Sequence, residues 1–348
     1  MSSAMHEHPR GDFSSSLQEP FRTANELGYR MPAEWEPCKR VWVCNPHNPQ
    51  TWPGCFDQAQ QQFDDVLNKL QKFVSVTSTQ ELDIETDDSW IRDYGPIFVV
   101  NAGGDLACHD FIFNCWGKKY DAYEKDGVAA QHIATKLGIP IWIHDMVLEG
   151  GSIDVNGRGT AITTCQCLLN ENRNPDLSRS QIEQVLQKTL GISHLIWLPG
   201  ALGADDTDGH VDTAARFITS DTIVAARVEQ SHPEHDVLEM NWQVLKNARD
   251  ECGNQLNLIE LPLPEPMFYE YPPDRFDSGG RLRLPASYAN FLIANTAVFV
   301  PVFGQPADDK ALRCLELAVP DYQIIPVRCE YLIVGLGGIH CLTVQQPQ

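Results

Sequence analysis

Two hydrophobic periods alternate along the chain. Residues 40–45 and 97–101 carry the short apolar runs of β-strands, whereas residues 56–73 place apolar side chains at the three- and four-residue spacing of an amphipathic helix. The same rhythm continues toward the C-terminal end and predicts about five strand–helix units. Further helices are predicted at 120–137, 178–190, 237–252 and 308–318, and further strands near 141–143 and at 152–155, 159–165, 194–199, 222–226, 256–261 and 299–303.

Three local patterns carry more specific predictions. Ser178, followed three residues later by Gln181, is typical of a capping box at the start of a helix. Residues 160–169, which contain two cysteines, are predicted to form one ordinary strand. Residues 262–285 are the longest irregular stretch, and such a stretch is either a binding loop or lid, or a plain surface excursion.

The globular body is expected to begin at Met31, where Met-Pro-Ala-Glu-Trp-Glu-Pro follows a polar, irregular segment. We therefore predict an N-terminal extension over residues 1–30 and a single domain over 31–348, because no composition shift marks a further boundary. The chain is 43% hydrophobic, which is enough for a substantial core. It shows neither an apolar run of about 18 residues nor an apolar signal core, so a cytoplasmic protein that does not enter a membrane is expected.

The chain is strongly acidic, with a formal net charge of −21. Nucleic-acid binding requires clustered Lys and Arg, which this sequence lacks, whereas a cationic substrate would be attracted. An acidic surface can also serve solubility alone. The cysteines number 11, an odd count without a secretion signal, which indicates reduced thiols. Cys165 and Cys167 have no second pair with zinc-module spacing, so no structural metal site is expected.

One cysteine stands out near the C-terminal end. Residues 335–343 read Gly-Leu-Gly-Gly-Ile-His-Cys-Leu-Thr, a glycine-rich turn that includes Gly338 and carries Cys341 as a candidate nucleophile. A thiol with an ordinary pKa of about 8.5 is mostly protonated at neutral pH, so it needs a partner. His210 is the candidate acid–base, because an imidazole with a pKa near 6.5 can both give and take a proton.

Three carboxylates accompany this pair. Asp212 follows His210 by two residues, and in an extended segment both side chains would face one cleft. Asp93 precedes Gly95-Pro96, which should place it at the end of an element. Glu149 is followed by two glycines, which allow a ligand or another backbone to approach. The acidic run at 205–208 could bind a divalent cation, but it lacks the spaced oxygen ligands of a calcium loop.

A guanidinium would use such a set of carboxylates. It is planar, always charged, and offers a fork of N–H donors that two carboxylates can bind. Asp93 and Asp212 could form this clamp. Their negative charge should raise the pKa of Cys341 in the free protein, and an arriving cation should reverse the effect, so that the substrate activates its own nucleophile.

At these residues the chain resembles the agmatine deiminase family of the guanidine-modifying, or pentein, superfamily. The resemblance implies an α/β propeller of five ββαβ-type units with pseudo-fivefold symmetry and the active site in its central channel. It extends from about residue 31 to the last few residues and includes segments 31–37, 45–49, 51–54, 90–96, 149–151, 169–175, 210–212, 287–295 and 335–343.

The resemblance also implies the roles of single residues. Cys341 would be the nucleophile, His210 the general acid–base and Glu149 the carboxylate that partners the histidine, while Asp93 and Asp212 would hold the guanidinium. The implied reaction hydrolyses a guanidine, most simply agmatine, to a urea and ammonia through a covalent thiouronium. Neither a metal nor a cofactor is implied, and relatives are commonly homo-oligomers. The further substrate-binding candidates are Trp90, Trp116 and Gly338.

Four alternatives stay open at this point. Trp90 and Trp116 suit the ammonium of agmatine, whereas Arg275, Arg281 and Arg283 would suit the carboxylate of free or peptidyl arginine if their loop folds over the cleft. A catalytically silent relative could bind a guanidinium through the same carboxylates. A Cys-His amide hydrolase would leave those carboxylates unexplained. A metal hydrolase would use residues 205–212.

Overall fold

One three-stranded topology recurs five times in the computed structural model, which describes residues 22–272 and 280–348. In each sheet the middle strand pairs antiparallel with the first strand and parallel with the third. In the order first, middle and third, the strands are β17 (Thr343–Pro347), β1 (Cys38–Val43) and β2 (Ser75–Ser78); β3 (Ile97–Val100), β4 (Leu106–Ile112) and β5 (Ile141–Val147); β6 (Ile153–Val155), β7 (Thr160–Thr164) and β8 (His194–Leu198); β9 (Ala215–Thr219), β10 (Thr222–Ala226) and β11 (Asn257–Leu261); β14 (Leu292–Ala294), β15 (Ala297–Val302) and β16 (Gln323–Arg328).

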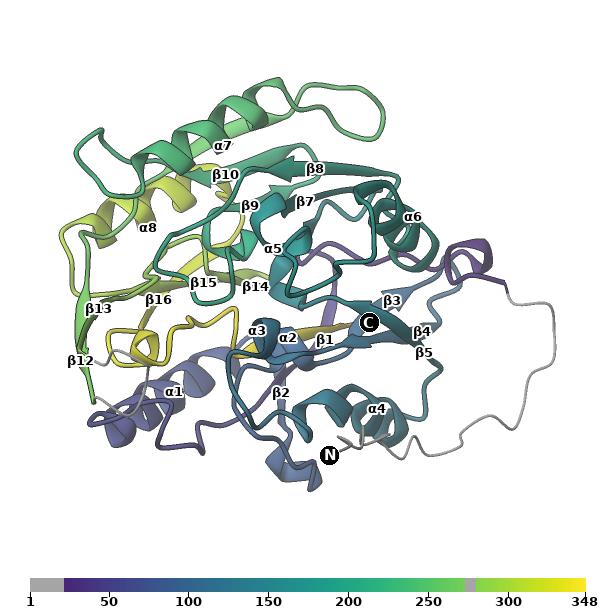
Figure 1. Cartoon of the computed structure of the whole chain (residues 1–348), viewed down its shortest axis with the longest axis horizontal. Helices are drawn as coiled ribbons and strands as arrows, with labels where there is room; N and C mark the ends of the chain where they lie inside the picture. The colour runs from purple at the N-terminus through teal and green to yellow at the C-terminus, as the bar shows by residue number, and fades with distance from the viewer. Residues whose placement is uncertain (1–21, 273–279) are drawn as a thin grey trace, which may run out of the picture.

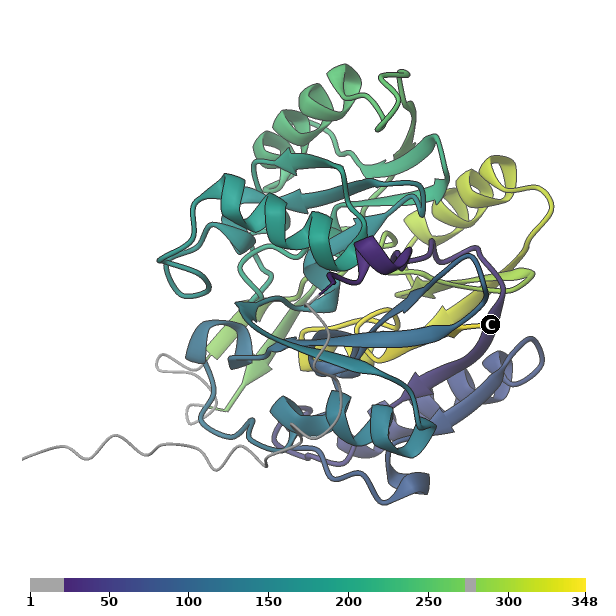
Figure 2. The ribbon, with the colours of Figure 1, turned by 90° about the vertical axis from the view of Figure 1, so that its right-hand side faces the viewer.

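A long helix connects the middle strand of each sheet to the third, because a parallel pair needs a crossover connection. Figures 1 and 2 show these helices on the outside of the molecule, with the strands between them. The α/β propeller of five ββαβ-type units that the family resemblance implies is thereby confirmed. The helices are α1 (Phe56–Leu70), α4 (Asp126–Leu137), α6 (Arg179–Leu190), α7 (His235–Asn247) and α8 (Ala307–Ala318).

The C-terminal strand closes the ring. β17 pairs with β1, with Val344 opposite Trp42, so the last strand of the chain completes the first unit. The turn just before β17, which carries Cys341, is held at the centre because of this pairing.

The long helices bury the apolar stripe that their sequences predict. In α1, Ala59, Phe63, Val66 and Leu70 recur every three or four residues, and all four are buried. Removing each large apolar side chain from water stabilises the fold by about 1.5–3 kcal/mol. The predicted capping box of α6 is confirmed, because Ser178 and Gln181 each bind the other's backbone. Among the described residues, no helix combines the length and apolar character needed to cross a membrane.

Three predictions about local structure were wrong. The strand expected over 160–169 ends at Thr164, whose hydroxyl accepts a hydrogen bond from Cys167 N (3.1 Å) and so starts the short helix α5 (Cys165–Leu168). The helix expected from residue 120 begins at Asp126. Residues 262–285 are not irregular throughout, because β12 (Phe268–Tyr271) and β13 (Gly280–Arg283) form an antiparallel hairpin.

Residues 22–30 lie against the body. The backbone of Arg30 exchanges hydrogen bonds of 3.0 and 2.9 Å with Val100, and Ala24 is buried. Residues 1–21 lie outside the described part. The division into an extension over 1–30 and one domain over 31–348 stays a prediction.

Candidate functional site

The predicted site residues come from loops that hold equivalent places in the repeated units. Each lies in the segment that leads into the first strand of a sheet, and these segments meet at the centre of the ring. Asp93 lies in α2 (Ile91–Tyr94) before β3, Glu149 precedes β6, His210 and Asp212 precede β9, and Cys341 precedes β17.

Gly151 marks the point where three of these side chains converge. A Cβ atom on this residue would lie 2.5 Å from His210 Nδ1, 2.9 Å from Asp93 Oδ1 and 3.1 Å from Asp212 Oδ2. His210 and Asp212 thus face one cleft as predicted, but the predicted extended backbone was wrong. Residues Val211–Thr213 form a 3-10 helix that begins directly after His210.

The thiol of Cys341 is enclosed by polar groups. Its Sγ lies 3.4 Å from Asn290 Nδ2 and 3.8 Å from Asp212 Oδ2, and the residue is only 8% exposed. Burial, together with the charges of Asp212 and Asp93, raises the thiol pKa well above its ordinary value. This direction agrees with the sequence-based prediction of a protonated nucleophile in the free protein. Asn290, which precedes β14, supplies the contribution of the fifth unit and was not predicted.

The glycines of the Cys341 turn allow neighbouring side chains to lie close to its backbone. A Cβ on Gly337 would lie 2.3 Å from the ring of Trp90, and one on Gly338 would lie 2.5 Å from Asn290 Oδ1. The left-handed residue of this turn is instead Leu336, with a φ of 73°. Gly338 therefore lets Asn290 reach the nucleophile, while its predicted contact with substrate stays a prediction.

Asp93 and Asp212 have opposite electrostatic environments. Asp93 accepts hydrogen bonds from Gly151 N (3.0 Å) and Trp116 Nε1 (2.9 Å), yet burial and the charge of Asp212 raise its pKa well above the usual range. Burial acts on Asp212 in the same sense, but the hydrogen bond and charge of His340 outweigh it and lower its pKa. The pair is therefore poised to gain a second negative charge when a cation enters.

His340 links the site to a buried ion network that the sequence analysis missed. Its Nδ1 lies 2.7 Å from Asp212 Oδ2, and its Nε2 lies 2.6 Å from Glu34 Oε1. Glu34 Oε2 in turn pairs with Arg216 Nη2 at 2.7 Å. Glu34 lies in segment 31–37, which carried the resemblance but received no role.

His210 is buried without a hydrogen-bond partner for either ring nitrogen among the described residues. Burial lowers its pKa to about 3, so the imidazole is neutral and able to accept a proton. Its Nδ1 lies 3.6 Å from Asp93 Oδ1, and its Nε2 lies 4.0 Å from Glu149 Oε2. The latter distance exceeds a hydrogen bond, so the expected pairing of Glu149 with His210 stays a prediction. Glu149 instead binds Arg173, with 2.6 Å between Oε1 and Nε.

The acidic run at 205–208 has a structural task. Asp205 accepts hydrogen bonds from Thr207 N (2.9 Å) and His210 N (3.1 Å), and Asp208 pairs with Arg173 (2.9 Å) and Lys119 (2.7 Å). These contacts hold the backbone of His210 and the cation that binds Glu149. Asp205 and Asp208 therefore each have partners within the protein.

A cavity of about 290 Å³ opens above Cys341. Trp90 and Trp116 line it together with Asp93, and their predicted contact with substrate stays a prediction. None of the lining residues that the structure describes is Lys or Arg. Its other acidic and aromatic lining residues are Asp87, Asp88, Tyr120, Asp121, Asp126 and Asp206.

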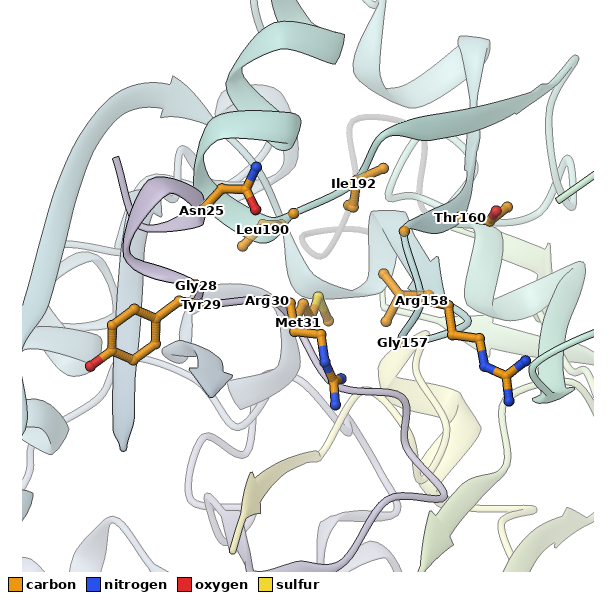
Figure 3. A pocket seen from close by; sticks show the side chains of 13 residues that line it. Asn25, Gly28, Tyr29, Arg30, Met31, Gly157, Arg158, Thr160, Leu190 and Ile192 are labelled. Atoms are coloured by element: carbon orange, nitrogen blue, oxygen red, sulfur yellow. The ribbon is translucent and has the colours of Figure 1, made fainter. Parts of the chain in front are cut away.

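A second cavity of about 250 Å³ lies between the N-terminal segment and the loop at Gly157–Gly159 (Figure 3). Arg30 and Arg158 are its charged lining residues, and the guanidinium of Arg30 is paired with Glu36 at 2.6 Å. None of the predicted site residues lines this cavity. The cavity above Cys341 is therefore the candidate active site.

Gly151 provides a sharp test of the convergence of side chains. We expect Gly151→Ala to lower activity by about 100-fold, because the added methyl would displace His210, Asp93 or Asp212 by several tenths of an ångström. Steady-state kinetics and a thermal unfolding curve would measure the effect. Gly127→Ala is the matched control, because its Cβ would meet nothing within 4 Å, and this variant should keep full activity. Equal losses in the two variants would contradict the convergence.

Comparison with known proteins places this geometry in context. A family model described as Porphyromonas-type peptidyl-arginine deiminase matches residues 30–347. Agmatine deiminase of Pseudomonas aeruginosa strain LESB58 is 34% identical, over 95% of this chain and 99% of its own length. Agmatine deiminase of Stutzerimonas stutzeri is 36% identical, over 93% and 97%. The solved structure of Enterococcus faecalis agmatine deiminase has a TM-score of 0.90 at 31% identity, over 96% and 100%.

Proposed function

Because this chain belongs to the Porphyromonas-type peptidyl-arginine deiminase family, we propose that it hydrolyses agmatine to N-carbamoylputrescine and ammonia. It is a hydrolase of C–N bonds in linear amidines. Relatives 34–36% identical over nearly their whole length are described as agmatine deiminases. The enzyme would work in the cytoplasm, on the route to putrescine, without a metal or organic cofactor.

The negative charge of the cavity above Cys341 is the observation that favours agmatine over arginine as the substrate. Agmatine has a cation at each end, and an acidic, aromatic cavity without a described Lys or Arg suits both ends. The carboxylate of free arginine would meet like charges there. Arg283 is paired with Glu234, and Arg281 stacks over Phe268, so neither arginine lines the cavity. Arg275 lies outside the described residues.

The first half of the reaction begins when the positive charge of the substrate enters the site. A guanidinium between Asp93 and Asp212 would neutralise the field that raises the pKa of Cys341, so the thiol gives its proton to neutral His210. Sγ then adds to the central guanidine carbon. His210 passes the proton to the departing nitrogen, the C–N bond breaks, and ammonia leaves a covalent thiouronium.

The second half uses water. His210 takes a proton from a water molecule, whose oxygen adds to the thiouronium carbon. The C–S bond then breaks, which releases the urea product and restores Cys341. One water is consumed and one ammonium is formed for each guanidinium. The buried network of Asp212, His340 and Glu34 keeps Asp212 ionised through this cycle.

A substrate panel tests the proposal. We expect kcat/KM for agmatine to exceed that for arginine by at least about 100-fold, because each misplaced buried charge costs several kcal/mol. A peptide with C-terminal arginine and methylated arginine complete the panel, and ammonia and ureido product are measured together. A preference for arginine or for the peptide would contradict the proposal that agmatine is the substrate, whereas the proposed deiminase reaction would still stand. No turnover of any guanidine would favour the silent relative.

A further inference from the structure

A second cysteine lies beside the acid–base pair. Cys167 is fully buried in α5, and its Sγ lies 4.0 Å from Glu149 Oε2. Glu149 Oε2 is also 4.0 Å from His210 Nε2. One ligand atom from each of Glu149, Cys167 and His210 lies within 4.8 Å of the other two. The reaction described above uses no thiol at this position.

Two of the three donor atoms, Cys167 Sγ and Glu149 Oε2, contact each other, and the third comes from an imidazole without a described partner. Neither ring nitrogen of His210 has a hydrogen-bond partner among the described residues, although the side chain is 1% exposed. Arg173 binds Oε1 of Glu149 and so fixes the carboxylate while leaving Oε2 directed at Cys167. The buried imidazole has no described hydrogen-bond partner and lies close to a carboxylate oxygen and a thiol. A cation bound to all three groups would give the imidazole the partner that it lacks.

The chemistry of the donors selects the cation. A thiolate, an imidazole and a carboxylate are the ligands of Zn²⁺, and with bonds of about 2.0–2.3 Å they lie roughly 3.3–3.8 Å apart around a tetrahedral ion. The present separations, which are 4.0 Å for Cys167 Sγ to Glu149 Oε2 and at most 4.8 Å within the set, therefore need to contract by up to about 1.5 Å. The thiolate and carboxylate would neutralise the ion, which makes its burial possible.

We propose that Glu149, Cys167 and His210 form an inhibitory site for a thiophilic divalent cation such as Zn²⁺. Binding forms an Sγ–metal bond and releases the thiol proton to solvent. The metal binds a ring nitrogen of His210, so the imidazole can no longer carry protons between Cys341, ammonia and water. The acidic residues of the cavity above Cys341 would attract the divalent cation toward the centre of the ring. The metal is not a cofactor, because it removes the base.

Cobalt provides a probe of the site that needs no catalysis. Full-length protein freed of metal is titrated with Co²⁺, and we expect a thiolate-to-cobalt charge-transfer band with tetrahedral visible bands, displaced by one equivalent of Zn²⁺. Cys341→Ser should keep these bands, and Cys167→Ser should lose them. Cys165→Ser is the matched control two residues away and should keep them. Absence of the bands in the wild type, or their loss in Cys341→Ser but not in Cys167→Ser, would overturn the proposal.

The inhibitory role rests on the proposed function and has its own readout. In agmatine turnover, the Zn²⁺ concentration for half-inhibition should rise at least about tenfold in Cys167→Ser relative to the wild type, since one of three ligands is lost. An unchanged value would overturn inhibition at this site. If Cys167→Ser does not fold, His210→Asn tests the same site through loss of the cobalt bands. Absent turnover with intact bands would overturn the deiminase reaction and leave the metal site standing.

Discussion

Cys341→Ala is expected to reduce agmatine turnover by more than about 10⁴-fold, because the proposed covalent thiouronium forms on the Sγ atom that this variant lacks. Substrate binding should survive, since Asp93 and Asp212 remain in place. Ammonia release in a coupled assay measures turnover, and calorimetry with agmatine measures binding. Mass spectrometry of the wild-type enzyme quenched during turnover should show the amidino adduct on Cys341.

The control for this variant is Cys252→Ala, which removes an exposed thiol that does not line the cavity above Cys341. It should turn over agmatine at the wild-type rate. Undiminished ammonia release by Cys341→Ala would exclude covalent catalysis by this residue. The Cys-His amide hydrolase alternative would be revived only if an amide substrate were cleaved with the same dependence on Cys341.

Asp212→Asn should change two measurements in opposite directions. Deimination should fall by about 10²- to 10³-fold, because one arm of the guanidinium clamp is lost. Alkylation of Cys341 by a neutral reagent should accelerate at neutral pH, because removal of a negative charge 3.8 Å from Sγ lowers the thiol pKa. The amide can be accommodated, since Asp212 Oδ1 has no hydrogen-bond partner among the described residues.

The pH dependence of the alkylation rate shows in which direction the pKa of the Cys341 thiol is shifted. In the wild type the thiol pKa is raised, so the rate should be slow at pH 7 and increase about tenfold per pH unit until the pH passes a value above about 8.5. In Asp212→Asn the same curve should shift to lower pH. Asp64→Asn, which removes an exposed charge on α1, should leave both measurements unchanged. A wild-type inflection near pH 6 would contradict substrate-assisted activation.

Candidate site residues can be identified from the sequence where an unusual residue type stands in a recognisable local setting. Asp93 before Gly-Pro, Glu149 before Gly-Gly, and Cys341 in its glycine turn could all be identified, and the structure places them in neighbouring units of one ring. The stripe of α1 and the cap of α6 were predictable for the same reason, because they depend on neighbours within one or two turns.

Errors arose where distant contacts override local preference. The strand expected over 160–169 ends early because the Thr164 side chain caps a helix. The stretch at 262–285, which was expected to be irregular, contains a hairpin whose Tyr269 hydroxyl donates a hydrogen bond of 2.6 Å to the carbonyl oxygen of Pro53. Asn290 lay in a recognised segment, but only its approach to Cys341 across 51 residues gives it a role.

The sequence by itself determined which chemical groups are present, their order along the chain, and the helical and extended periods that build the five units. The tertiary structure alone decided which groups touch. Closure of the ring by β17 brings His340 to Asp212 and Glu34 across 128 and 306 residues, and the short helix α5 after β7 brings Cys167 to Glu149. Such contacts are set by the burial and register of whole sheets, which no local pattern of residues encodes.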